Sequence, residues 1–338
     1  MMRCPWDRFC PCWIAARGNQ PTTRSLVRSI QHFPTSLFTP THTHPRLTMK
    51  LQGAFTALVT PFTPDGSAVD YEKLREIVEW QIQEGIDGLV PMGTTGESPT
   101  VSHEEHDKVI AEVVKYVNGR VPVIAGTGSN STSEALRLTQ AAKDAGADAC
   151  LVVCPYYNKP TQKGLYEHFK AVASVGLPVV LYNIPGRTGI NLTPQTIAEL
   201  SKVPNIVAIK EATGSLDQAS EIAALCDITI LSGDDNLTLP MMAIGATGVI
   251  SVLSNASPAK VLGVTRPALK GDFATAKKAH LENIFLVKTL FAEANPQPVK
   301  KAMELLGKCS ATVRAPLVAC EPATVEKLTE QLKLHKLL

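Results

Sequence analysis

The sequence predicts a protein of the α/β class, and three observations support that prediction. After Met49, short apolar runs rich in strand-forming residues alternate with longer amphipathic stretches, a pattern typical of strand–helix units around a parallel sheet. Eight such runs precede residue 272, and each interval between them has room for a helix. The 338 residues exceed the roughly 250 that a (β/α)8 (TIM) barrel needs. We therefore expect one such barrel with a small C-terminal helical domain.

The predicted strands cover residues 54–60, 88–92, 121–125, 149–154, 179–183, 206–210, 228–231 and 248–252. Helix starts between them carry local signals. Ser102 with Glu105 and Ser131 with Glu134 fit the capping box, and Pro194 suits a first helical turn. After residue 272 the strand pattern ends, and residues 273–294, 299–306 and 323–337 predict helices. The expected domains are a barrel over residues 49–271 and a helical domain over residues 272–338.

The first 48 residues differ in composition from the rest of the chain. They contain one acidic residue, Asp7, against six arginines, with many Ser, Thr and Pro. Such a segment cannot build a core, so we expect a disordered extension. A transit peptide has this composition, and so does sequence upstream of a misassigned start codon. We favour the second interpretation, because Met49 opens directly onto the first predicted strand.

Charge and composition exclude several classes of function. The 33 basic and 31 acidic residues give a formal net charge of +2, too even a balance for a nucleic-acid binder. No apolar run reaches the roughly 18 residues of a membrane span, so no membrane association is expected. The five cysteines after residue 49 are expected to be reduced, with Cys150 and Cys154 packed around a strand. The expected ligand is a small molecule.

In a parallel barrel the active site lies at the carboxyl ends of the strands. Polar residues that directly follow an apolar run are therefore candidate functional residues. Lys210 ends the run Ile206–Ile209. A lysine at such a place is usually a solvated strand end. In a barrel mouth, however, burial favours the neutral amine, which can attack a ketone carbonyl.

Tyr182 ends another apolar run and precedes a loop with Pro185, Gly186 and Arg187. A half-buried rim tyrosine is one interpretation. A phenol at the same rim as Lys210 could instead transfer protons, and the planar guanidinium of Arg187 suits a carboxylate.

Two further segments resemble ligand-binding motifs, one a phosphate loop and the other a zinc site. Gly93-Thr94-Thr95-Gly96-Glu97 follows the second strand, and its glycines let backbone amides approach a ligand, but it lacks the ending of a phosphate loop. His103 and His106 invite comparison with a zinc site. Their spacing is i and i+3 instead of the i and i+4 of HExxH, so we favour a solvated helix start and expect no metal.

Four segments together resemble the dihydrodipicolinate synthase family, also called the 4-hydroxy-tetrahydrodipicolinate synthases. They are Gly93-Thr94-Thr95-Gly96-Glu97, Tyr156-Tyr157-Asn158, Tyr182-Asn183-Ile184-Pro185-Gly186-Arg187-Thr188-Gly189 and Ile209-Lys210-Glu211-Ala212-Thr213-Gly214. The similarity runs from about residue 53 to the C-terminus. It implies condensation of pyruvate with L-aspartate 4-semialdehyde, in the diaminopimelate route to lysine, without a metal or organic cofactor.

The resemblance also implies roles for single residues. Lys210 resembles the Schiff-base lysine, and Tyr182 the central proton donor and acceptor, linked through Thr94 to Tyr157. The family's counterpart of Tyr157 crosses a dimer interface, which implies a dimer, and the family usually forms a homotetramer, a dimer of dimers. The remaining implied substrate contacts are the hydroxyl of Thr95 and the backbone carbonyl of Ile250 for pyruvate, and the guanidinium of Arg187 for the semialdehyde's carboxylate.

A second implied site is an allosteric pocket for L-lysine as feedback inhibitor. Its residues would be Ser98, His103, His106, Asn130, Glu134 and Tyr156. The simpler interpretation is that Glu134 only caps a helix with Ser131. Because plant enzymes differ at the position of His103, its presence favours bacterial-type regulation and a cytoplasmic protein.

The alternative function is that of another lysine-dependent pyruvate aldolase, such as N-acetylneuraminate lyase or a keto-deoxy sugar acid aldolase. These relatives share the lysine and the tyrosine but generally lack the arginine, because their second substrate is a polyol chain. Arg187 therefore favours the semialdehyde. A non-catalytic barrel would be favoured only if Lys210 or Tyr182 were replaced.

Overall fold

The computed structural model describes residues 50–338, and the expected extension over residues 1–48 lies outside this range. Eight parallel strands form one sheet in the order β2-β1-β8-β7-β6-β5-β4-β3. Their bounds are β1 Gly53–Ala57, β2 Gly88–Val90, β3 Ile124–Gly126, β4 Ala149–Val153, β5 Val179–Asn183, β6 Ile206–Glu211, β7 Thr229–Ser232 and β8 Gly248–Ser251. All eight predicted strands are confirmed, with ends that differ by a few residues.

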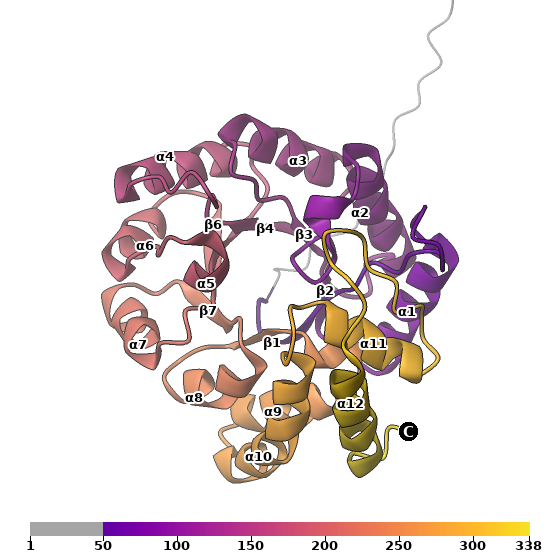
Figure 1. Cartoon of the computed structure of the whole chain (residues 1–338). Coiled ribbons are helices and arrows are strands. Elements are labelled where there is room, and N and C mark those ends of the chain that lie inside the picture. Colours follow the sequence, from indigo (N-terminus) through magenta and orange to yellow (C-terminus); the bar gives the residue numbers. More distant parts are fainter. Residues whose placement is uncertain (1–49) are drawn as a thin grey trace, which may run out of the picture. The chain divides into compact units, whose positions relative to one another are not determined.

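The barrel is nearly closed between its end strands β2 and β3. A single parallel bridge joins Leu89 to Val123, and the amide of Gly126 donates to the carbonyl of Pro91 at 2.9 Å. The helices form a ring outside the strands (Figure 1). The predicted barrel fold is therefore confirmed.

The helices are α1 Tyr71–Gln83, α2 His103–Val117, α3 Thr132–Asp144, α4 Gln162–Ala173, α5 Pro185–Thr188, α6 Pro194–Leu200, α7 Leu216–Leu225, α8 Thr238–Ala243, α9 Pro258–Leu269, α10 Phe273–Leu290, α11 Gln297–Leu305 and α12 Pro322–Leu334. Three short 3-10 turns are η1 Ser98–Thr100, η2 Asp235–Leu237 and η3 Leu253–Asn255. The three predicted C-terminal helices correspond to α10, α11 and α12. Their division from the barrel as a separate domain stays a prediction.

One of the two predicted capping boxes is present. Ser102 accepts a bond from the amide of Glu105 at 3.1 Å, and the carboxylate of Glu105 accepts the amide of Ser102 at 3.0 Å. The capping box predicted for Ser131 and Glu134 is absent, so that prediction is wrong. The amide of Ser131 instead donates to the hydroxyl of Ser129 at 3.0 Å, which leaves the Glu134 carboxylate free for other partners.

Apolar side chains pack in two layers, one inside the barrel and one between the strands and the helices. Alternation along β6 places Ala208 in the inner layer and Ile209 in the outer one, so Lys210 points inward. Cys150 and Cys154 are buried in the outer layer, and all five cysteines in residues 50–338 are free, as predicted. In the same range, no helix is both long and apolar enough to cross a membrane.

A very close backbone approach lies where β1 meets β8. A β-carbon added at Gly248 would lie 2.0 Å from the carbonyl oxygen of Gly53. We expect Gly248→Ala to push the two strands apart and lower the free energy of unfolding by about 1–3 kcal/mol. In the control Gly263→Ala, within α9, the new carbon would lie 3.7 Å from Ala279, and a gain of about 0.5–1 kcal/mol is expected. Denaturant titration of both variants measures the difference, and equal losses would contradict the argument.

Candidate active site

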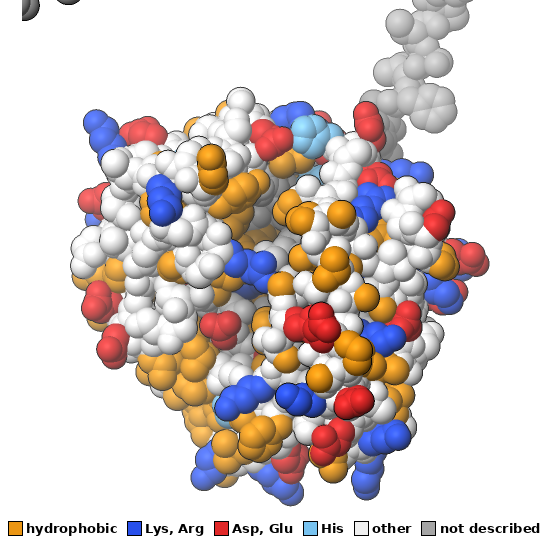
Figure 2. Space-filling model, viewed as in Figure 1, with side chains coloured by type: hydrophobic (Ala, Val, Ile, Leu, Met, Phe, Trp, Pro, Cys, Tyr) orange, Lys and Arg blue, Asp and Glu red, His pale blue; other side chains and the backbone are white. Residues whose placement is uncertain are grey.

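A cavity of about 480 Å³ opens at the end of the barrel where the strands finish. Figure 2 shows this face hollowed near its centre. One set of lining residues contains Thr94, Tyr182 and Arg187, and another contains His103 and Glu134. The loops after β2, β3, β4 and β5 therefore contribute to one continuous space.

Lys210 and Tyr182 lie side by side at this end of the barrel. They are paired in register across β5 and β6, and the Lys210 Nζ lies 4.2 Å from the centre of the Tyr182 ring. Both side chains are buried, at 6% and 5% exposure. An amine and a phenol thus meet in a poorly hydrated space beside the cavity, where proton transfer between a bound substrate and the phenol is geometrically feasible.

Two hydroxyls and a guanidinium lie at the cavity or directly beside its lining. Thr94 lines the cavity, and Thr95 is buried, with its Oγ1 accepting a bond from Asn295 Nδ2 at 2.9 Å. Because that oxygen accepts from Asn295, its own proton stays available for a ligand. The exposed side chain of Arg187 donates from Nη2 to the backbone carbonyl of Asn295 at 3.2 Å. Asn295 therefore connects two predicted substrate-binding residues.

Sequence reasoning missed Asn295 because it lies in the segment after residue 272, away from any strand end. It also missed Asp234 and Asp235, although both lie within three residues of the end of β7. Asp235 accepts bonds from the hydroxyl of Ser251 and from the amides of Val252 at 2.9 Å and Leu253 at 3.1 Å, which joins the ends of β7 and β8. Burial raises the pKa of Asp234, and the nearby charge of Lys210 opposes that rise.

Four residues of the predicted catalytic and substrate-binding sets do not line the cavity within one chain: Lys210 and Thr95, which are buried beside it, and Tyr157 and Ile250. The side chain of Tyr157 is 89% exposed, its backbone is left-handed with φ of 71°, and it does not line the cavity. Ile250 is buried in the inner layer of the barrel, paired in register with Phe55. A single chain therefore does not bring Tyr157 to Tyr182 and Thr94.

The second predicted set borders the same cavity. Glu134 accepts a bond from the hydroxyl of Ser129 and lies 2.8 Å from His103 Nε2, and these contacts lower its pKa. Ser98, Pro99 and Tyr156 also line the cavity, whereas Asn130 does not. The backbone carbonyl of Asn130 instead accepts Asn158 Nδ2 at 2.8 Å.

The predicted solvation of both histidines is correct for His103 and wrong for His106. His106 is 3% exposed, because it faces inward from the first turn of α2, with its Nε2 3.0 Å from the carbonyl of Gly126. Burial lowers its pKa. Within residues 50–338, no three His, Cys, Asp or Glu side chains are grouped to hold a metal ion.

Comparison with known proteins places this geometry in a family. The sequence profile of the dihydrodipicolinate synthetase family matches residues 50–335. The chain belongs to this family. It is 56% identical over 290 residues to the 4-hydroxy-tetrahydrodipicolinate synthase of Citrifermentans bemidjiense, covering 85% of this chain and 99% of that one. The synthase of Geobacter sulfurreducens is 55% identical with the same coverage.

Solved structures agree. Dihydrodipicolinate synthase from Aquifex aeolicus superposes with a TM-score of 0.83 at 50% identity, over 85% of this chain and 98% of that one. The Acinetobacter baumannii enzyme complexed with pyruvate gives 0.84 at 45% identity, over 86% and 100%. The predicted family, fold and synthase-type lyase activity are confirmed, and the main prediction is supported over another pyruvate-dependent aldolase.

Proposed function

We propose that the chain condenses pyruvate with L-aspartate 4-semialdehyde through a Schiff base on Lys210, giving 4-hydroxy-tetrahydrodipicolinate and water. The observation that carries the proposal is the buried pairing of Lys210 with Tyr182, 4.2 Å from Nζ to the ring centre, beside a cavity with an arginine on its wall. A neutral amine in such a space can attack the ketone of pyruvate and release water as the imine forms.

The remaining steps need proton transfers that the neighbouring side chains can supply. Loss of a methyl proton turns the imine into an enamine, whose carbon attacks the aldehyde of the second substrate. The amine of that substrate then attacks the imine carbon, closes the ring and releases Lys210. Tyr182 is positioned to carry protons, Thr95 and the Ile250 carbonyl to bind the pyruvate end, and Thr94 to connect Tyr182 with a further tyrosine.

Arg187 supports the semialdehyde as second substrate. Its guanidinium is exposed at the cavity, and the backbone carbonyl of Asn295 accepts one of its donors. The other donors can bind a carboxylate, which the semialdehyde carries and the polyol chain of a sugar does not. The reaction needs no metal or organic cofactor in this proposal.

Trapping with borohydride tests the division of roles. Incubation with pyruvate and borohydride should attach a reduced pyruvyl group to Lys210, detected by mass spectrometry, and Lys210→Ala should abolish it. Tyr182→Phe should slow turnover heavily and keep part of the adduct, because only proton transfer is lost. Equal adduct loss in both variants, or turnover only with sugar acids, would refute the proposal.

We further propose a cytoplasmic homotetramer, a dimer of dimers, in which Tyr157 enters the neighbouring site. The exposure of Tyr157 and its absence from its own cavity support this arrangement. The bacterial origin of the synthases cited above supports the cytoplasm. A solved relative at 40% identity and TM-score 0.83 is described as a monomeric variant, so relatives differ in assembly.

Mixing experiments test the shared site. Tyr157→Phe chains and Lys210→Ala chains should each be nearly inactive, and their hybrids should recover turnover, because some sites then receive both native residues. Native mass spectrometry of the mixture verifies that hybrids formed, because the two variant chains differ in mass. Properly formed hybrids without recovered activity would show that the site is built within one chain.

We also propose that L-lysine binds at the end of the cavity near Glu134. The carboxylate of Glu134 can pair with an ammonium, and Tyr156, whose pKa is raised by burial and by the charge of Glu134, offers a hydroxyl. A relative from Cyanidioschyzon merolae, 39% identical with a TM-score of 0.83 over 85% of this chain and 99% of that one, was solved with lysine bound. Contacts from Asn130 remain part of the proposal.

Titration of lysine into the assay should give partial inhibition, with a coupling of about 1–3 kcal/mol between the sites. Glu134→Ala should remove the inhibition because the ammonium loses its partner. Glu112→Ala is the matched control. Glu112 lies near the C-terminal end of α2 and pairs with the exposed Lys115, so this variant should keep the inhibition by lysine. Full activity at millimolar lysine, with no heat of binding in calorimetry, would contradict the proposal.

A further inference from the structure

The loop that carries Thr94 and Thr95 has a constrained backbone. Glu97, just after it, adopts a left-handed conformation with φ of 55° and ψ of 37°, and Met92, just before it, has φ of 57°. Side chains with a β-carbon disfavour this region. Tight turns within the loop, such as Glu97 N to Thr94 O at 3.1 Å, accompany these angles. A backbone of this kind persists only where its surroundings hold it.

The strongest contact of this loop comes from α11, more than 200 residues further along the chain. Lys300 Nζ lies 2.6 Å from Glu97 Oε1, and neither side chain is exposed at all. The second oxygen of Glu97 accepts the backbone amide of Arg314 at 3.0 Å. The ammonium of Lys300 also lies 4.1 Å from the ring centre of Phe62. Both oxygens of the carboxylate are therefore held by the C-terminal segment.

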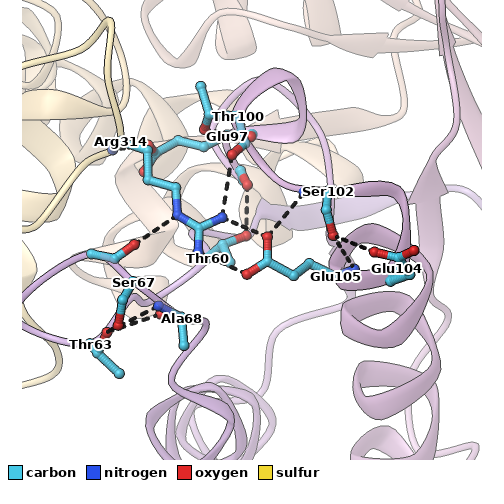
Figure 3. Close-up of polar contacts among 12 residues, drawn as sticks. Thr60, Thr63, Ser67, Ala68, Glu97, Thr100, Ser102, Glu104, Glu105 and Arg314 are labelled. Carbon is cyan, nitrogen blue, oxygen red and sulfur yellow. Dashed lines mark hydrogen bonds and ion pairs between the residues drawn. The ribbon is translucent and has the colours of Figure 1, made fainter.

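Further contacts from the same segment act on the residues after the loop and on the loop itself. The guanidinium of Arg314 bonds to both oxygens of Glu105, at 2.6 and 2.8 Å, and to the carbonyl of Thr100 at 3.3 Å, as Figure 3 shows. Within the loop, Asn295 donates to Thr95. Residues 93–105 are thus attached to the segment after residue 290 at several points.

A fully buried ion pair is a poor source of stability, because removal of two charges from water offsets most of their attraction. It does fix geometry, because each charge tolerates few alternative partners in a dry interior. We propose that Lys300 is a positioning residue for the pyruvate site: its ion pair with Glu97 fixes the loop that carries Thr94, at the cavity, and Thr95, buried beside it. This inference rests on the proposed function, in which Thr95 binds the pyruvate carboxylate.

The decisive variant is the double substitution Glu97→Gln with Lys300→Met. Lys300→Met alone leaves a buried carboxylate without its cation and is expected to unfold more easily, whereas the double variant removes both charges. Its thermal midpoint should stay close to that of the wild type. Its kcat/KM for pyruvate should fall by about 10–100-fold, mainly through a higher KM, because a small displacement of the loop misplaces the carboxylate partner. The KM for the semialdehyde should change less.

Lys301→Met is the matched control, since Lys301 lies on the same helix but pairs with the exposed Glu304, and it should leave all constants unchanged. A stable double variant with the pyruvate KM of the wild type would overturn the positioning role. If the double variant does not fold, Glu97→Asp keeps both charges on a shorter side chain, and an unchanged KM there also overturns it. Borohydride trapping on the wild type separates the two proposals: no adduct there rejects the reaction itself, whereas a normal adduct leaves only the role of Lys300 in question.

Discussion

The pairing of Tyr182 with Lys210 in adjacent parallel strands is the constraint on which the site depends. Side chains alternate along a strand, so Val180 and Tyr182 point into the barrel from β5, as Ala208 and Lys210 do from β6. Because the two parallel strands are in register, the phenol and the amine lie at the same level along the barrel axis. The other groups of the site lie on loops that follow the strands. Their positions relative to this fixed pair decide whether they can contact the same substrate.

The parts of the molecule that could be predicted from the sequence are those with a local signal. Strands follow from short apolar runs, and Lys210 and Tyr182 from their places at strand ends; the same rule applied to Asp235 would have found the carboxylate that joins β7 to β8. No local signal marks Asn295 or Lys300, because their partners lie about 200 residues away. The false capping box has a different and local cause, because the hydroxyl of Ser129, two residues before Ser131, accepts the amide of Ser131.

The cavity offers a short physical route between the two proposed ligand sites. Glu134 and Tyr156 line it together with Tyr182 and Arg187, so an occupant near Glu134 changes the charge and the water content of the space that the substrates enter. Tyr156 is also the chain neighbour of Tyr157. A ligand that orders Tyr156 therefore restricts the backbone of the residue proposed to complete the neighbouring site. Coupling between the sites then needs no movement of the barrel.

Two buried lysines lie near the mouth of the barrel, and their surroundings give them different roles. Lys300 is enclosed completely and bonded to Glu97, so its charge is compensated and its position is fixed. Lys210 is slightly exposed beside the ring of Tyr182, and no carboxylate within residues 50–338 lies at ion-pair distance from it. An aromatic face attracts an ammonium less strongly than a bonded carboxylate does. Among the described residues, the amine of Lys210 is therefore not held in an ion pair and can meet a substrate in the proposed reaction, whereas Lys300, bonded to Glu97, is suited to hold a loop.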